Sequence, residues 1–223
     1  MGRFPQPAAS KGSQKWVQMI INEKPKFLNE KIRRKLNLQK DEDIQWLSPL
    51  KRDGYAEYRD QEFVDRLGVN LRRIPLADFW PKNGPQWDAL GKSFFGKLLL
   101  VEAKSHIPEL ISTMQAKDKE SEMKILKSLE KTKHFLNIKA ETEWSRPFYQ
   151  YTNRIAHLYL LRRNELLAYL VFIYFINDLE MRGPTTEKEW KGAITLLHSY
   201  LGIGRHKLQN FIADVFVDVA HLE

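Results

Sequence analysis

The sequence contains no cysteine among its 223 residues. Disulfide bonds, thiolate zinc sites and cysteine nucleophiles are therefore excluded, and any bound metal must use oxygen or imidazole ligands. The lack of cysteine also fits a reducing compartment, so we expect a cytoplasmic protein.

Long apolar runs are missing as well. The longest, Leu166 to Ile176, is much shorter than the roughly 20 residues that cross a bilayer, and its aromatic and β-branched residues favour a buried strand. The opening residues MGRFPQPAASKGSQ contain no apolar core of a signal peptide. We therefore expect a flexible basic tail there and no membrane association.

Positive charge is in excess. The chain has 36 Lys and Arg against 28 Asp and Glu, a formal net charge of +8. Such a surface attracts polyanions such as nucleic acid, although an acidic protein partner would suit the charge equally. Hydrophobic residues make up 43% of the chain, which is enough for a substantial core.

The chain is expected to divide into a tail and helical N-terminal extension over 1–50 and a main domain over 51–223. Apolar residues recur at helical spacing on both sides of Pro25, which predicts two short basic helices in the extension. A helix is predicted over Tyr55 to Leu67 before Gly68. Further helices are predicted to begin near Pro108, Met123, Pro147 and Thr186, and a last strand is predicted in NFIADVFVDVA.

The segment from Trp87 to His106 carries the clearest pattern. The strings WDAL, GKSFFGK and LLLVEAKSH predict a β-hairpin whose second strand is apolar and ends in charged residues. Because successive side chains of a strand point to opposite faces, Glu102 and Lys104 share a face. Asp88, on the partner strand, would lie beside Glu102 at the open end of the hairpin.

Two carboxylates beside a lysine suit metal-assisted hydrolysis. Asp88 and Glu102 would form a hard oxygen site for Mg²⁺ or Mn²⁺. Lys104 would then position, and help to deprotonate, a metal-bound water for attack on a phosphodiester. A structural ion pair is the alternative, but burying it without a function would carry a desolvation penalty.

Similar letters occur a second time, without the strand. Asp118, Glu122 and Lys124 lie in a hydrophilic stretch that favours a helix. Only Glu102 follows four consecutive strand formers, LLLV. The strand context therefore favours the first set of residues over the second.

This order of an acid-bearing helix, a strand with Asp, a strand ending in Glu-x-Lys and a helix resembles the core of the PD-(D/E)XK nuclease superfamily, over roughly Tyr55 to Met114. The resemblance implies an α/β restriction-endonuclease-like fold, with a mixed central sheet flanked by helices and extra N- and C-terminal helices. Trp87 replaces the proline that often precedes the aspartate in this superfamily. The strings FWPKNGPQWDALG and LLLVEAKSHIPEL also resemble bacterial proteins of a distinct family.

The resemblance assigns roles to particular residues. The implied metal ligands are Asp88, Glu102 and the backbone carbonyl of Ala103, and the implied catalytic lysine is Lys104. The acid of the superfamily's first helix would be Glu57 or Asp60. Candidates for substrate contact are His106 and Gln150.

Other polar and aromatic residues have more ordinary explanations. Asn153, Arg154 and His157 follow Gln150 on one predicted helix, where Arg154 and His157 are better read as core polar residues than as functional ones. The tryptophans at 80, 87, 144 and 190 could stack on bases, but most are expected in the core.

Three functions are therefore compared. The first is a Mg²⁺- or Mn²⁺-dependent endo- or exonuclease acting on nucleic acid, with DNA as the expected substrate and a homodimer as the form that would suit cleavage of both strands. The second is a non-catalytic nucleic-acid-binding module on the same fold. The third is a basic interaction protein with an acidic partner.

Overall fold

The structure is a computed structural model that describes residues 2–39 and 42–222; residues 1, 40, 41 and 223, which belong to the expected extension and main domain, lie outside the described residues. The strands are β1 (Arg3–Phe4), β2 (Ile44–Ser48), β3 (Glu57–Tyr58), β4 (Ala89–Ser93), β5 (Leu98–Lys104), β6 (Ala168–Ile176) and β7 (Ile212–Asp218). The α-helices are α1 (Gly12–Glu23), α2 (Pro25–Leu36), α3 (Asp60–Leu67), α4 (Leu76–Phe79), α5 (Lys119–Leu136), α6 (Tyr149–Arg163) and α7 (Glu187–Leu201). Short 3₁₀ helices span Lys51–Asp53, Ile107–Leu110, Gln209–Phe211 and Val219–His221.

A five-stranded mixed sheet forms the centre of the fold, in the order β2-β4-β5-β6-β7. β2 pairs antiparallel with β4, and β4 pairs antiparallel with β5. β5, β6 and β7 are parallel, because the connections from β5 to β6 and from β6 to β7 cross over through helices. The expected α/β class, with a mixed sheet flanked by helices, is confirmed.

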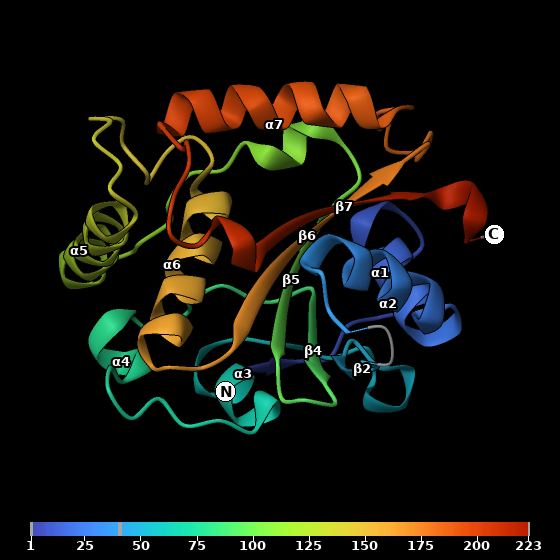
Figure 1. Ribbon diagram of the computed structural model, residues 1–223, viewed down its shortest axis with the longest axis horizontal. Helices are drawn as coiled ribbons and strands as arrows, with labels where there is room; N and C mark the ends of the chain where they lie inside the picture. The colour runs from blue at the N-terminus through green and yellow to red at the C-terminus, as the bar shows by residue number, and fades with distance from the viewer. Residues whose placement is uncertain (1, 40–41, 223) are drawn as a thin grey trace.

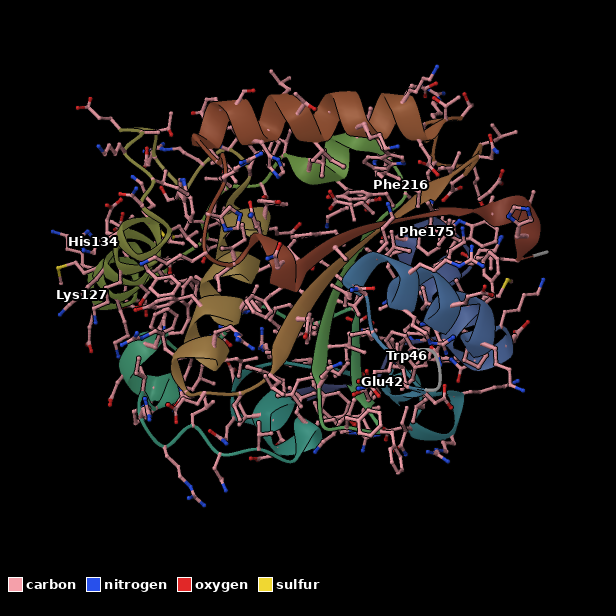
Figure 2. All side chains as sticks on the ribbon, in the orientation of Figure 1. Glu42, Trp46, Lys127, His134, Phe175 and Phe216 are labelled. Atoms are coloured by element: carbon pink, nitrogen blue, oxygen red, sulfur yellow. The ribbon has the colours of Figure 1, made fainter. Side chains whose placement is uncertain are left out.

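Helices cover both faces of this sheet (Figure 1). α1 and α2 pack on one face, in a core that includes Leu99, Val101 and Ala103 of β5. α3, α5, α6 and α7 contribute to the core on the other face, which includes Leu98 and Leu100. The side chains drawn in Figure 2 fill the space between these layers. β6, with most of its residues buried, is the central strand that its apolar run predicts.

The alternation along β5 determines which way its charged residues point. All seven residues of this strand are buried. Leu98 and Leu100 face the layer that contains α6, so Glu102 and Lys104 continue the same face. The strand therefore directs a carboxylate and an ammonium group toward α6.

The N-terminal residues take part in the same structure. β1 pairs antiparallel with β3, so Arg3 and Phe4 of the expected flexible tail are held by a partner strand. β2, at the end of the expected extension, is an edge strand of the main sheet. The two predicted basic helices are present as α1 and α2, and Pro25 is the first residue of α2.

Three predicted helices begin or end elsewhere. The helix expected from Tyr55 begins only at Asp60, because the preceding residues pair with β1 as β3. The helix expected from Pro108 is one 3₁₀ turn, since the backbone N–H of Met114 donates to the carbonyl of Ser145 instead of to its own segment. α5 begins four residues before Met123, because Asp118 caps it by accepting the N–H of Ser121 at 2.8 Å.

Among the described residues, no helix combines the length and the apolar character that a membrane crossing requires.

Gly183 lies against the end of β5 and provides a test of this packing. A Cβ atom at Gly183 would lie 2.2 Å from the carbonyl oxygen of Ser105, the residue after Lys104. We expect Gly183→Ala to lower the free energy of unfolding by roughly 1–3 kcal/mol, because the backbone must shift to accept the methyl group. Denaturant unfolding followed by circular dichroism measures this change.

Gly192 is the matched control. It lies inside α7, and a Cβ atom there would meet nothing within 4 Å. Gly192→Ala should raise the free energy of unfolding by about 0.5–1 kcal/mol through helix propensity. Equal effects of the two substitutions would contradict the close contact at Gly183.

Candidate active site

The candidate site forms where β4 begins and β5 ends. Because the two strands are antiparallel, with Ala89 opposite Val101, the residue before β4 lies beside the C-terminal end of β5. That residue is Asp88, and its Oδ2 accepts the backbone N–H of Ala103 at 2.7 Å. The hairpin thus brings Asp88 next to Glu102 and Lys104, as the sequence predicts.

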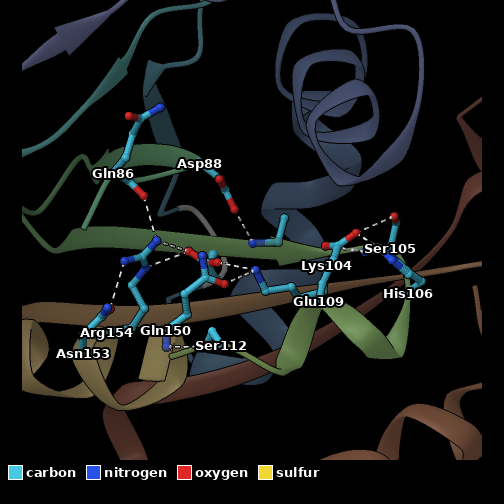
Figure 3. A network of polar contacts seen from close by, with 12 residues as sticks. Gln86, Asp88, Lys104, Ser105, His106, Glu109, Ser112, Gln150, Asn153 and Arg154 are labelled. Carbon is cyan, nitrogen blue, oxygen red and sulfur yellow. Dashed lines mark hydrogen bonds and ion pairs between the residues drawn. The ribbon is translucent and has the colours of Figure 1, made fainter. Parts of the chain in front are cut away.

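Glu102 is buried between two cations, Lys104 and Arg154, both of which are labelled in Figure 3. Its Oε1 accepts from Lys104 Nζ at 2.5 Å, and its Oε2 accepts from Arg154 Nε at 2.6 Å. Only 2% of Glu102 is exposed. Charge-assisted bonds at both oxygens compensate for the hydration that this carboxylate loses on burial.

The neighbouring charges favour the ionised forms of both Glu102 and Lys104. Burial raises the pKa of Glu102, but Arg154 and Lys104 outweigh it, so that the pKa of this carboxyl lies below its usual value. Burial lowers the pKa of Lys104, but the charges of Glu102 and Asp88 outweigh it and raise that pKa overall. Lys104 is therefore an ammonium group at neutral pH.

The protonation equilibrium of Asp88 is shifted in the opposite direction, toward the neutral form. Burial, followed by the negative charges of Glu102 and Glu57, raises the pKa of Asp88 well above its usual value. Burial also raises the pKa of Glu57, with a contribution from Glu102. The three carboxyl groups thus lie close enough to repel one another, a situation that a bound cation would relieve.

Glu57 faces the site from a strand, not from the helix on which it was expected. Its Oε2 accepts from Gln86 at 2.5 Å, and its Oε1 accepts from Gln14 of α1 at 3.2 Å. The expectation of a helical acid at Glu57 is therefore wrong, because residues 57 and 58 form β3. With Gln6, which donates to Oε2 at 3.4 Å, three amide groups hold its carboxyl in place.

Asp60, the other expected helix acid, is the first residue of α3. Its carboxylate accepts the backbone N–H groups of Asn83 at 3.2 Å and of Gly84 at 2.8 Å. Asp60 therefore fixes the loop before β4, whereas Glu57 faces the site.

α6 brings two side chains to the site. The Oε1 of Gln150 accepts from Lys104 at 2.9 Å, and its backbone N–H donates to Ser112 at 2.8 Å. Arg154, one turn later, also donates from Nη2 to the carbonyl of Gln86 at 2.8 Å. Arg154 is buried, as expected of a core polar residue, and the structure in addition brings its guanidinium to Glu102, a contact that the sequence interpretation did not include.

A signal for Arg154 exists in the sequence. Residues four apart on a helix lie on the same face. Arg154 therefore lies on the same face of its helix as Gln150, which was already a candidate for substrate contact. The buried carboxylate at the end of β5 also required a second cation if Lys104 alone could not satisfy both of its oxygens.

The two histidines singled out in the sequence, His106 and His157, have different surroundings. His106 Nδ1 lies 2.5 Å from Glu109 Oε1, and His106 does not line the cleft that contains Asp88. His157 is fully buried beside Trp80 and Trp87, and burial lowers its pKa to about 3, so that it is neutral. The four highlighted tryptophans are buried in the core.

A cleft of about 840 Å³ opens over the site. Its walls include the acids Glu57, Asp88 and Glu102, together with the cations Lys104 and Arg154. Arg59, Lys82 and Lys117 add positive charge along the same walls. Asp118 is a further acid in the lining, so the cleft carries charges of both signs.

The fit of a metal ion is mixed. The chemistry of the donors suits Mg²⁺, because they are carboxylates, and the carbonyl of Ala103 lies on the same edge of β5 as the N–H that bonds Asp88. Both oxygens of Glu102, however, are bonded to cations. In the part of the chain that the structure describes, no three His, Cys, Asp or Glu side chains form a ready metal-binding group.

Comparison of the chain with protein-family models, with curated proteins and with solved structures finds no match.

Removal of Arg154 tests the charge balance at Glu102. Arg154→Ala should lower the free energy of unfolding by about 3 kcal/mol, because it leaves one oxygen of a buried carboxylate without its cation. Denaturant unfolding at pH 7 measures the loss. Arg146→Ala is the control, since Arg146 and Glu143 form an exposed pair, and its removal should change little.

Replacement of Asp88 should have the opposite effect on stability from replacement of Arg154. Because its folded pKa is raised, ionised Asp88 costs stability once the pH exceeds the ordinary value of 3.8, and the full cost is reached above the folded pKa. We expect Asp88→Asn to raise the free energy of unfolding at pH 7–8 by on the order of 1 kcal/mol, with the gain vanishing near pH 3.

Thermal or denaturant unfolding across this pH range measures the difference. Asp78→Asn, at an exposed position of α4, is the control and should show no such pH-dependent gain. A loss of stability in Asp88→Asn at neutral pH would contradict the repulsion among the three carboxyl groups.

Proposed function

We propose that this chain is a metal-dependent nuclease that hydrolyses phosphodiester bonds, with DNA as the expected substrate, on a restriction-endonuclease-like fold. One observation carries the proposal. Asp88, Glu102 and Lys104 converge at adjoining ends of β4 and β5, inside a cleft of about 840 Å³. Nothing in the packing of an α/β core requires these charges at that place.

Asp88, Glu102 and the Ala103 carbonyl would hold Mg²⁺ or Mn²⁺, with Glu57 as a further acid. When bound, such an ion supplies Lewis-acid stabilisation of the phosphate and a water of lowered pKa. The raised pKa values of Asp88 and Glu57 support this role, since they reflect burial together with the negative charge of neighbouring carboxyl groups.

Lys104 has a more limited part than the sequence suggested. Because its pKa is raised, it holds its proton at neutral pH and cannot serve as a general base in this arrangement. Its ammonium group would instead donate to a water or a phosphate oxygen and stabilise the charge that develops there. Gln150, bonded to Lys104 at 2.9 Å, fixes its direction.

The charge of the chain supports an anionic substrate. The formal net charge is +8, and Arg59, Lys82 and Lys117 line the cleft beside the acids. Phosphate groups on either side of the scissile bond would meet these cations.

A non-catalytic nucleic-acid-binding module is the second candidate. The pairing of Glu102 with both Lys104 and Arg154 favours it, because a carboxylate neutralised at both oxygens is a weak metal ligand. In that case the cleft would bind the backbone of nucleic acid, and the buried ion pairs would be structural.

Cleavage assays separate the two candidates. Plasmid, linear, single-stranded and branched DNA, and RNA, are incubated with the native chain and Mg²⁺ or Mn²⁺, and with Glu102→Gln and Lys104→Met. We expect metal-dependent cleavage by the native chain and a loss of at least about 100-fold in each variant, since each removes a charge that acts on the reacting groups.

The second Asp, Glu and Lys set provides matched controls. Glu122→Gln and Lys124→Met change the same residue types on α5, outside the charge cluster of β5, and should retain native cleavage. Circular dichroism establishes that each variant is folded. Folded native protein that cleaves none of these substrates would reject the nuclease and leave the binding module, and cleavage that is equal in all variants would reject a nuclease centre at Glu102 and Lys104.

A further inference from the structure

A second, basic hollow lies between α5, α6 and the segment before β7, outside the cleft. It has a volume of about 450 Å³, and its lining includes Lys131, His134, Arg163 and Lys207 together with the aromatic residues Phe135 and Tyr159. We call this cavity, with the residues that line it, the basic hollow. His134 is labelled on α5 in Figure 2, on the side of the molecule away from α2.

The positive charge of the basic hollow is not neutralised by the protein. Within the described residues, Lys131, Arg163 and Lys207 form no ion pair with a carboxylate, and the lining contains no acid. The acids nearest in sequence have other partners, because Glu130 pairs with Lys133 at 2.9 Å and Glu165 pairs with Arg73 at 2.6 Å.

Two of these cations, Lys207 and Arg163, lie near the aromatic ring of Phe135. Lys207 Nζ lies 5.1 Å from the centre of the Phe135 ring, and the guanidinium carbon of Arg163 lies 5.9 Å from it. Two of the three cations, Arg163 and Lys207, therefore lie near one aromatic side chain, and Lys131 lines the same hollow; all three are exposed. Converging, exposed and unpaired cations are the chemistry that binds phosphate groups.

α5 links the basic hollow to the cleft. Ser121 and Ile125, near the start of this helix, line the cleft, and Lys131 lines the hollow. The ten residue-to-residue steps from Ser121 to Lys131 correspond to roughly 15 Å of helix, or about four to five base pairs of duplex. One nucleic-acid strand could thus occupy both.

We infer that the basic hollow binds backbone phosphates of the nucleic acid whose reacting segment lies in the cleft. The inference rests on the proposed function for the class of substrate, but not on catalysis. The hollow would anchor the strand several nucleotides from the scissile bond and would contribute affinity without reading base sequence.

Binding of a labelled 20-base-pair duplex by the full chain tests the inference. Fluorescence anisotropy in EDTA, at several salt concentrations, compares the native chain with Lys131→Gln/Lys207→Gln. Loss of two phosphate contacts should weaken binding roughly fivefold to tenfold and should make the slope of log K against log salt less steep by up to about 1.8.

Lys26→Gln/Lys35→Gln is the matched control. It removes two charges from α2, on the other face of the sheet, and Lys35 also lies over an aromatic ring, 5.9 Å from the centre of Phe216. The control should bind DNA as the native chain does. Equal affinity and equal slope in the two double variants would overturn the inference, whether both match the native chain or both bind more weakly.

Competition identifies the occupant. Duplex DNA without label should displace the probe from the native chain, whereas inorganic phosphate at the same phosphate concentration should not, since it lacks adjacent groups. Displacement by polyglutamate equal to that by DNA would overturn the inference in favour of an acidic protein partner. Because EDTA prevents cleavage, a failed nuclease assay leaves this result unaffected, and a failed binding result leaves the nuclease assay unaffected.

Discussion

The buried carboxylate of Glu102 is the constraint on which the rest of the site depends. An isolated carboxylate with 2% exposure would be too costly to keep ionised, so its environment must supply positive charge. Lys104 comes from the same strand and Arg154 from a helix on the facing layer. The register of β5 and the position of α6 are therefore coupled through one side chain.

A second group of carboxyls has weaker compensation. The pKa values of Asp88 and Glu57 are raised by burial and by neighbouring carboxylates, and Lys104 and Arg154 oppose this shift only in part. Their hydrogen bonds come from neutral donors, namely the Ala103 N–H for Asp88 and the amides of Gln86, Gln14 and Gln6 for Glu57. The site thus contains one carboxylate bonded to two cations beside two carboxyls that are bonded to neutral groups, and a bound cation would act on those two.

The sequence predicts the elements whose signals are local. The hairpin of β4 and β5 follows from an apolar run, a turn and a charged end, and β6 follows from an unbroken apolar segment. Glu102 and Lys104 share a face because the period of a strand is two. The nuclease activity, the metal and the restriction-endonuclease-like fold stay predictions.

What depends on distant contacts was not predictable. β3 exists because two residues near the N-terminus pair with it, and two-residue strands carry no periodic signal. The helix face of Arg154 can be read from its spacing to Gln150, but its partner Glu102 lies 52 positions away in the sequence and could not be identified. The 3₁₀ turn at Ile107–Leu110 replaces a helix because the chain after it bonds to residues beyond 140.

The pairing of Glu102 with Arg154 also restricts how this chain can change during evolution. Loss of Glu102 leaves Lys104 and Arg154 without their carboxylate in the interior, and loss of Arg154 leaves one oxygen of Glu102 without its cation. Single replacements at these positions therefore pass through a destabilised protein. We expect the three residues to change together, although Arg154 lies far from the other two in the gene, and such covariation would mark the site even where the overall similarity between sequences has decayed.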